Sequence, residues 1–341
     1  MSASKRWNGF VDGVLDAAVV PGFSRIGYTI RSRVQHFTPL ADYSLAGRTI
    51  VVTGPTSGLG RAAAEALATM GASLVLVGRN PAKLVSVAAS IAQAADAASL
   101  LRSTGDIPVI ETAIAEMGDL AAVRRVCAEI VTRHGAIDAV VHNAGALLNQ
   151  RTLSAQGHEQ TIASHVLGPH LMTTLLLGQL RAANGRVVTV SSGGMYAASL
   201  GTPADISAGR WPEMAVGEYD GTRQYAIAKR MQVTLNEMWA TREPEVRFAA
   251  MHPGWADTPG VQQSIPTFRL LARPLLRTVQ QGADTIAWLV ADDAMEARSG
   301  AFWCDRAVRP THRLPGSRRS DDNVNRAALW DWCQRQSGAD T

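Results

Sequence analysis

The chain has 341 residues, a formal net charge of +4 and 46% hydrophobic residues, so it can hold one large domain or two average ones. No long basic run carries interleaved aromatic residues, which excludes the usual signature of a nucleic-acid-binding protein. Cys127, Cys304 and Cys333 are few and far apart, which excludes a disulfide framework and predicts a reducing compartment. The histidines are scattered singly, so no metal site is predicted.

Residues 1–45 are predicted to form an arm outside the main domain. Apolar residues recur at roughly helical spacing up to Phe37, with arginines between them. We favour an amphipathic arm packed on the protein's own surface, and the alternative is a basic helix that lies on a membrane. The apolar stretch at residues 10–20 is too short and too interrupted to span a bilayer or act as a cleavable signal. We therefore expect a cytoplasmic protein, with peripheral membrane contact left open, and no contact between this arm and a dinucleotide.

Residues 46–306 alternate between strand and helix patterns. Strands are expected at residues 48–53, 73–78, 108–115, 139–142, 186–191, 246–251 and 301–304. Helices are expected from Pro81, from Asp119 as an N-cap, and over residues 161–180 and 225–241. This alternation predicts a single α/β domain of the doubly wound Rossmann type. Its seven-stranded, mainly parallel sheet would be covered by helices on both faces, with the ligand at the carboxyl ends of the strands.

Residues 307–341 are predicted to form a C-terminal linker and a short helix. The part at residues 309–319 is rich in Pro, Gly and Arg and is expected to be extended. A helix then begins near Asp321 and carries Trp330 and Trp332. Two close tryptophans favour burial against the domain, and an exposed partner-binding helix is the alternative.

A glycine-rich turn follows the first predicted strand and opens an Ala-rich helix. Its expected cofactor-binding residues are Gly54, Thr56, Ser57, Gly58, Leu59 and Gly60. Glycines let the backbone approach a pyrophosphate, and the helix N-terminus offers free N–H groups and a positive dipole. The order strand, glycine turn, helix therefore predicts a dinucleotide site.

Four further motifs follow this turn in a fixed order. They are His142-Asn143-Ala144-Gly145, Ser191-Ser192, Tyr225-x-x-x-Lys229, and Pro253-Gly254 with Thr258. With the glycine turn, this order resembles the short-chain dehydrogenase/reductase family over residues 46–306. The longer segments at residues 190–195, 251–261 and 281–285 are similar to one branch of that family, for which the resemblance defines no substrate.

The resemblance implies a catalytic set. Tyr225 would donate or accept the proton, Lys229 would lower the pKa of Tyr225 and hold the nicotinamide ribose, and Ser192 would orient the substrate oxygen. A free tyrosine, with a pKa of about 10, needs such help near neutral pH. The spacing of four places Tyr225 and Lys229 on one face of a helix.

The cofactor choice is predicted from the end of the second strand. Arg79 offers a guanidinium where a 2′-phosphate would lie, which favours NADP(H) over NAD. Glu116 stands where the family usually has an adenine-contacting Asp. The remaining residues expected at the cofactor by resemblance are Asn143, Ala144, Gly145, Tyr225, Lys229, Pro253, Gly254 and Thr258.

One position departs from the family pattern. His165 falls where the family has a fourth catalytic residue, an Asn that supports a water linked to the lysine. Histidine can donate, accept and titrate near neutral pH, so a proton relay could be rebuilt around His165 or be impaired. A helix histidine satisfied by a backbone partner is the structural alternative.

The segment between Ser192 and Tyr225, here called the insert, is long for the family. Its apolar and aromatic residues are Met195, Tyr196, Leu200, Trp211, Pro212, Met214 and Tyr219. Because the insert leaves one catalytic residue and returns to another, we expect it to border the substrate pocket, although part of this set could serve packing. Residues 261–276 occupy the family's variable lid and are also apolar. Both segments predict an apolar substrate.

The sequence therefore predicts an NADP(H)-dependent oxidoreductase that interconverts an apolar carbonyl and alcohol by hydride transfer. A cofactor-binding sensor or scaffold without useful turnover is the alternative, favoured by His165 in place of Asn. A third hypothesis is a membrane-surface adaptor that uses residues 1–45. Whether the protein forms a homo-oligomer is left open.

Overall fold

The computed structural model describes residues 9, 11–16, 18–102, 107–264, 269–270 and 272–339. Its centre is an eight-stranded sheet with the order β3-β2-β1-β4-β5-β6-β7-β8. The strands are β1 Thr49–Thr53, β2 Ser73–Gly78, β3 Ile110–Ile114, β4 Ala139–His142, β5 Arg186–Val190, β6 Arg247–Met251, β7 Phe302–Cys304 and β8 Ala307–Val308.

All pairings from β3 to β7 are parallel, and only β8 pairs antiparallel with β7. The doubly wound prediction is confirmed, and the seven predicted strands gain the short edge strand β8 as an eighth. The strand order reverses between β1 and β4, which places a crevice at their carboxyl ends.

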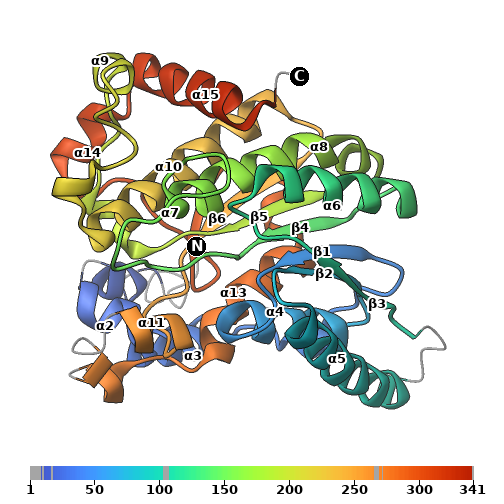
Figure 1. Cartoon of the computed structure of the whole chain (residues 1–341). Helices are drawn as coiled ribbons and strands as arrows, with labels where there is room; N and C mark the ends of the chain where they lie inside the picture. The colour runs from blue at the N-terminus through green and yellow to red at the C-terminus, as the bar shows by residue number, and fades with distance from the viewer. Residues whose placement is uncertain are drawn as a thin grey trace.

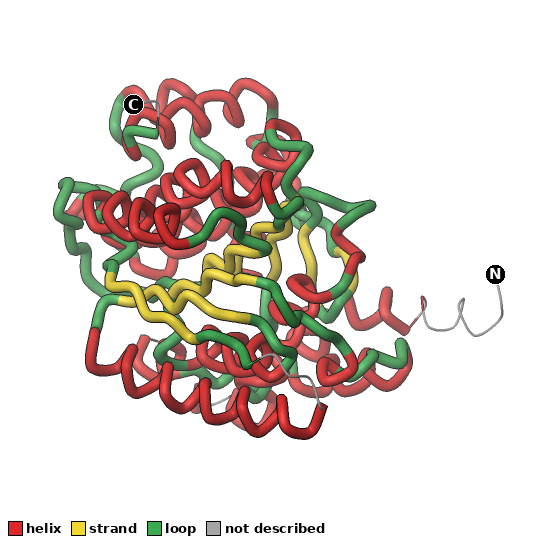
Figure 2. Tube along the Cα trace, turned by 90° about the vertical axis from the view of Figure 1, so that its right-hand side faces the viewer, coloured by secondary structure: helices red, strands yellow, loops and turns green. Residues whose placement is uncertain are grey.

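Two helical layers sandwich the sheet (Figures 1 and 2). One layer contains α4 Gly58–Thr69, α5 Pro81–Arg102 and α13 Val279–Ala291, and the other contains α6 Leu120–Arg133, α8 Gly168–Ala182 and α10 Gly221–Arg242. Each layer buries an apolar cluster against its own face of the sheet. The Ile, Val and Leu residues of the central strands β1, β2, β4 and β5 are buried on both faces, as expected of a covered parallel sheet, whereas Ile114 on β3 is exposed.

Short elements complete the fold around this core. The short α-helices are α2 Val19–Phe23, α3 Arg25–Val34, α7 Gln160–Ile162, α9 Pro203–Ser207, α11 Pro259–Ser264 and α14 Pro315–Ser320. The 3-10 turns are η1 Leu40–Asp42, η3 Gly193–Ala197, η4 Val216–Glu218, η5 Arg273–Leu275 and η6 Asp293–Met295, and η2 Ala163–Leu167 is a π-helical turn. As predicted, Asp119 caps α6, since its side chain accepts hydrogen bonds from the N–H groups of Ala121 and Ala122.

The C-terminal segment ends in α15 Asn323–Ser337, which lies across the upper helical layer (Figure 1). The side chains of Leu329 and Cys333 are fully buried, and that of Trp332 is almost fully buried. All three pack into the apolar cluster that also contains residues of α8 and α10. The predicted docking of this helix is thus found. The prediction of an extended linker at residues 309–319 is wrong in part, because Pro315 begins α14.

The N-terminal residues pack on the domain through a charged network. Arg31 of α3 is buried and pairs with Asp12 and Asp305, while Asp12 also binds Arg309. The surplus of basic residues near the two ends is therefore partly neutralised by these contacts. Among the described residues, no helix combines the length and apolar character needed to cross a bilayer. The division into an arm, a dinucleotide-binding domain and a C-terminal segment stays a prediction.

Candidate active site

The glycine turn lies between β1 and α4 and fits tightly against the end of β4. Gly54 has a φ of +67°, and a Cβ atom added there would lie 2.8 Å from the Cα of Ala144. A Cβ atom at Gly60 would lie 2.2 Å from the side-chain nitrogen of Asn143. Only glycine fits these two positions, so the turn follows the sheet edge closely.

The N-terminus of α4 is open to an anion. Ser57 is the N-cap residue, yet its side chain makes no capping hydrogen bond. The first N–H groups of this helix thus have no side-chain cap and point toward the crevice end of the sheet. Of the predicted cofactor residues, Thr56 lies in this turn, whereas the Leu59 side chain faces Gly282 of α13. A pyrophosphate fits this cradle, and Leu59 could meet it only through its backbone.

Asn143 ties the glycine turn to β4. Its side-chain nitrogen donates to the carbonyls of Thr53 and Gly54, each at 3.1 Å. The Thr53 hydroxyl in turn accepts from the N–H groups of Asn143 and Ala144, each at 3.0 Å. Asn143 and Ala144 therefore fix the floor of the crevice at its switch point.

Gly145 lies against His165. A Cβ atom at Gly145 would lie 2.3 Å from Nε2 of that histidine. Gly145 is expected at the cofactor by resemblance, and its nearest neighbour in the structure is this imidazole ring. A side chain at residue 145 would displace His165.

Two adjacent serines follow β5 and lie in different environments. The buried Ser191 hydroxyl donates to the carbonyl of Lys229 at 3.0 Å. The half-buried Ser192 hydroxyl accepts from the N–H of Gly194 at 3.2 Å and begins η3. Because Ser192 is accessible and Ser191 is occupied by the helix backbone, the geometry agrees with the choice of Ser192 as the substrate-facing serine.

Tyr225 lies next to Ser192 and is protonated at neutral pH. Burial raises the pKa of Tyr225 to about 12, and a hydrogen bond with Ser192 acts in the opposite direction. Burial is the largest influence on this pKa, and the lowering expected from Lys229 stays a prediction. The Lys229 ammonium lies 5.2 Å from the centre of the Tyr225 ring.

Lys229 is buried and donates hydrogen bonds to two neighbouring residues. Its Nζ donates to the Val190 carbonyl at 2.8 Å and to Oε1 of Gln232 at 3.0 Å. Burial lowers the pKa of Lys229 to about 7, so its charge changes near neutral pH. The protonation state of Lys229 can therefore change when its hydrogen-bond partners change.

Gln232 is a site residue that the sequence motifs missed. Its Nε2 donates to the backbone carbonyl of His165 at 2.8 Å, while its Oε1 accepts from Lys229. The amide thus bridges Lys229 to the π-helical turn η2. The spacing of three residues from Lys229 on α10 could have indicated it, since such residues share a helix face.

His165 is held as a neutral ring. Its Nε2 lies 2.9 Å from the Ala146 N–H nitrogen and 3.1 Å from the Ala146 carbonyl oxygen, so it finds a backbone partner as an acceptor in one tautomer and as a donor in the other. Burial, with the charge of Lys229, lowers the pKa of His165 well below its ordinary value. Nδ1 has no hydrogen-bond partner among the described residues. A proton relay that needs a charged His165 is not favoured by this environment.

Arg79 and Glu116 meet at the adenosine end of the crevice. Arg79 follows β2 and Glu116 follows the neighbouring strand β3, and their side chains pair at 3.1 Å. Arg79 is 77% exposed, so this pair costs little to open. Two residues predicted to contact different parts of the cofactor therefore contact each other.

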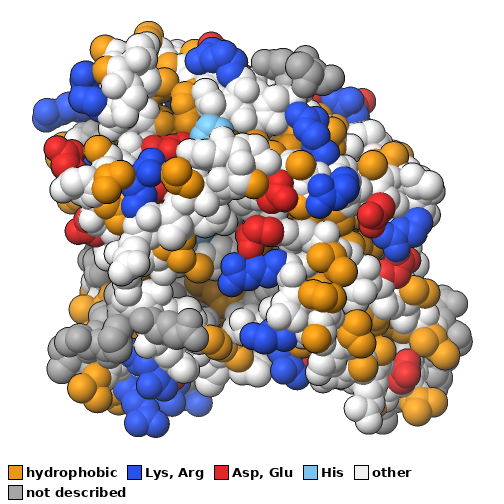
Figure 3. Space-filling view, viewed as in Figure 1, with side chains coloured by type: hydrophobic (Ala, Val, Ile, Leu, Met, Phe, Trp, Pro, Cys, Tyr) orange, Lys and Arg blue, Asp and Glu red, His pale blue; other side chains and the backbone are white. Residues whose placement is uncertain are grey.

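The segment after β6, residues 252–258, is here called the lip. His252 Nδ1 accepts from the N–H of Gly254 at 3.0 Å, and Gly254 has a φ of +71°. A Cβ atom at Gly58 would lie 3.4 Å from the Cβ of Thr258, so the lip reaches the glycine turn. Pro253 also approaches α13 beside Gly282. The lip thus lies against both the glycine turn and α13. Figure 3 shows one face of the molecule hollowed near its centre, between the two helical layers.

The insert does not line the crevice as predicted. Met195, Leu200, Trp211 and Met214 are buried in apolar clusters, and the Tyr196 hydroxyl donates to the Pro310 carbonyl. The packing alternative therefore accounts for most of this set. Of the apolar lid residues, Ile265, Phe268 and Leu271 lie outside the described part of the chain.

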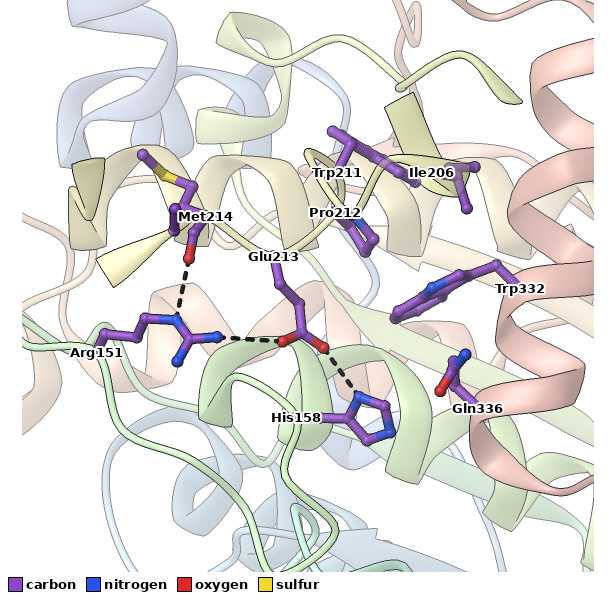
Figure 4. A pocket seen from close by; sticks show the side chains of 11 residues that line it. Arg151, His158, Ile206, Trp211, Pro212, Glu213, Met214, Trp332 and Gln336 are labelled. Atoms are coloured by element: carbon purple, nitrogen blue, oxygen red, sulfur yellow. Dashed lines mark hydrogen bonds and ion pairs between the residues drawn. The ribbon is translucent and has the colours of Figure 1, made fainter. Parts of the chain in front are cut away.

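A separate cavity of about 270 Å³ lies between the insert and α15 (Figure 4). Trp211 and Trp332 line its apolar side, and Arg151, His158 and Glu213 form an ionic cluster on the other. Neither Ser192 nor Tyr225 is among its lining residues. This cavity is distinct from the catalytic crevice.

Comparison with known proteins agrees with this geometry. The family described as short chain dehydrogenase matches residues 48–204. Dehydrogenase/reductase SDR family member 12 from Bos taurus is 35% identical over 312 residues, covering 90% of this chain and 91% of the relative. Human retinol dehydrogenase 14 is 29% identical over 317 residues, covering 88% and 89%. A solved short chain dehydrogenase from Salmonella enterica serovar Typhi aligns with a TM-score of 0.59 at 23% identity, over 80% of this chain and 100% of that one.

The match to member 12 confirms the branch that the segments at residues 190–195, 251–261 and 281–285 indicated. Its identity and its coverage of both chains establish the relationship independently of any single motif. The chain belongs to the short-chain dehydrogenase/reductase family, and it is an oxidoreductase of the type that acts on a CH–OH or C=O group with NAD(P).

Proposed function

We propose that this protein is an NADP(H)-dependent reductase of an apolar carbonyl, with Tyr225 as the proton donor. The observation that carries the proposal is the grouping of Ser192, Tyr225 and Lys229 beside the glycine cradle at the carboxyl edge of the sheet. When bound, the nicotinamide supplies or accepts the hydride. The protein's own residues orient the substrate and handle the proton.

The protonation states favour reduction. Burial raises the pKa of Tyr225 to about 12, so the phenol carries its proton at neutral pH. In reduction, the Tyr225 hydroxyl would give this proton to the carbonyl oxygen while Ser192 donates a hydrogen bond to the same oxygen. Lys229, with a pKa lowered to about 7 by burial, would stabilise the phenolate left behind.

NADP(H) preference rests on Arg79. Its exposed guanidinium follows β2, where a 2′-phosphate could replace Glu116 as its partner. Glu116 opposes this preference when its carboxylate stays close to the phosphate. Because the exposed ion pair of Arg79 and Glu116 is weak, we expect Arg79 to bind the 2′-phosphate in preference to Glu116.

The apolar substrate is supported by the name of one relative, since retinol is an apolar alcohol. The exposed Leu270 and the half-buried Val261 are the described lid residues consistent with it. A panel of apolar ketones, aldehydes and quinones, followed by the loss of NADPH absorbance, tests the proposal. Turnover with NADPH above that with NADH is the expected result, and turnover with neither cofactor across the panel contradicts it.

A second candidate, a cofactor-binding sensor without useful turnover, is favoured by one observation. Gln232 fills the space between Lys229 and the His165 carbonyl with an amide, which exchanges protons poorly. Tight NADPH binding without hydride transfer in a single-turnover experiment would favour this candidate.

A further inference from the structure

The N-terminal arm reaches the reactive end of the crevice. The Phe23 ring packs between Gly193, which follows Ser192, and His252 of the lip. A Cβ atom at Gly193 would lie 2.9 Å from this ring, and the rings of Phe23 and His252 meet edge-to-face at 4.3 Å. Phe23 is only 6% exposed. One arm side chain therefore contacts both segments that frame the catalytic residues.

The arm backbone is also bonded to the lip. The Phe23 carbonyl accepts from the N–H of Trp255 at 2.8 Å. The Trp255 ring lies edge-on to the Phe23 ring, with 6.1 Å between centres. The arm thus holds the lip by both a main-chain hydrogen bond and an aromatic contact.

Arg277 joins the arm, the lip and the sheet. Its guanidinium donates to the Gly22 carbonyl at 3.1 Å, to the Pro253 carbonyl at 3.2 Å and to Oδ2 of Asp305 at 2.9 Å. Its Nε donates to the Phe23 carbonyl at 3.0 Å. Arg277 is 1% exposed, so these bonds form away from water, where losing one leaves a buried charge unpaired.

The lip has no room for a side chain at Gly254, where it meets Arg277 and Phe23. A Cβ atom at Gly254 would lie 2.3 Å from the Arg277 guanidinium carbon and 2.6 Å from the Phe23 carbonyl oxygen. Arg31 fixes the same stretch from the other side, since it donates to the Gly22 carbonyl and to Asp305, each at 2.7 Å. The position of the lip therefore depends on the position of the arm.

We propose that the N-terminal arm sets the position of the lip, and that Phe23 and Arg277 are positioning residues for the nicotinamide half of the cofactor. This inference rests on the proposed function. The lip follows β6 and is joined through Phe23 to Gly193 beside Ser192, whereas the glycine turn and Arg79 would hold the adenosine half at the β1–β2 side. The expectation that residues 1–45 have no bearing on the cofactor is thereby revised. Loss of the arm contact should affect the nicotinamide half alone.

The test compares two ligands that share the adenosine half. Affinities for NADPH and for adenosine 2′,5′-bisphosphate, which lacks nicotinamide, are measured by calorimetry for the full chain and for Phe23→Ala, Phe23→Leu and Arg277→Lys. We expect Phe23→Ala and Arg277→Lys to weaken NADPH by about tenfold or more while the bisphosphate changes by less than about twofold. Phe23→Leu, which refills part of the space, should recover much of the NADPH affinity.

Arg306→Lys is the matched control. Arg306 is also largely buried and also holds the arm, through the Thr38 carbonyl and Asp284, but it makes none of the lip contacts described above. We expect it to lower the melting temperature without changing the ratio of the two affinities. The fluorescence of bound NADPH gives a second measurement, because it reports the surroundings of the nicotinamide ring and should change in Phe23→Leu even if Phe23→Ala fails to fold.

The outcomes separate this inference from the proposed function. Equal weakening of both ligands, or no change in either, would overturn the positioning role. A wild-type chain that binds neither ligand would instead refute the proposed function. If the wild-type protein prefers NADH, affinities for NADH and for ADP, which lacks nicotinamide, are compared in the same way, and the same outcomes support or overturn the positioning role.

Discussion

The His165 ring lies edge-on against the Tyr225 ring, with 5.5 Å between their centres and 81° between their planes. Gly145 leaves the space for this contact, because its missing Cβ would overlap the histidine ring. His165 is neutral and buried, so it acts on Tyr225 as a packing surface and a fixed dipole rather than as a charge. The residue that departs from the family pattern therefore still touches Tyr225, the proposed proton donor.

Removal of the Tyr225 hydroxyl should abolish turnover and leave cofactor binding nearly intact. Tyr225→Phe deletes the group that gives the proton while keeping the ring that packs on His165. NADPH affinity and the steady-state rate are measured on the same preparation. A Phe variant that turns over substrate at close to the wild-type rate would exclude Tyr225 as the proton donor.

Arg79→Ala should weaken NADPH selectively, by about 1.5–3 kcal/mol if charged hydrogen bonds to the 2′-phosphate form. Glu116→Gln should do the opposite and tighten NADPH, because it removes the carboxylate that pairs with Arg79. NADH binding serves as the control for both variants. Equal losses for the two cofactors in Arg79→Ala would show that Arg79 does not contact the phosphate.

Gln232→Glu should raise the pKa of Lys229. An anionic partner at the position of Oε1 favours the ammonium, and this opposes the burial that lowers the pKa of Lys229 to about 7. The alkaline limb of the pH profile of kcat/KM should therefore move to higher pH. Gln232→Leu keeps the volume without the charge and should not produce this upward shift.

Stability should fall as the pH drops below about 6.5. Burial lowers the pKa of both His142 and His252 to about 3 and that of His165 well below its ordinary value. Below pH 6.5 the unfolded chain binds protons that the folded chain does not, so the free energy of unfolding falls as protons are added. Three such groups contribute at most about 4 kcal/mol per pH unit. Melting temperatures measured across this pH range report the slope. The variant His142→Asn should reduce the slope by the contribution of about one proton.

A chain truncated before Tyr43 should melt at a lower temperature than the full chain, because it loses the buried contacts of Phe23 and Arg31. We expect neither chain to float with liposomes. Flotation of the full chain alone would instead support the membrane interpretation of the exposed Val14, Val20 and Ile26.

The local signals in the sequence predicted most of the fold. Strand and helix patterns placed seven strands within about two residues of their observed ends, which is the usual uncertainty of such boundaries. Helix spacing also predicted that Tyr225 and Lys229 share a face. The insert packs against α15 and lines a separate cavity rather than the crevice beside Ser192 and Tyr225, because an apolar pattern does not distinguish a residue that faces one site from a residue that faces another.

The sequence by itself determined the glycine turn, the alternation of strands and helices, and the shared helix face of Tyr225 and Lys229, since each depends on residues close together along the chain. The tertiary structure alone decided that Glu116 pairs with Arg79 and that Phe23 packs on the lip. These contacts join residues far apart in sequence, and no periodic pattern around either residue identifies the other as its partner. Such pairings arise only when the strands are ordered in the sheet and the chain ends pack over its edge, because packing selects them from many alternatives of similar local energy.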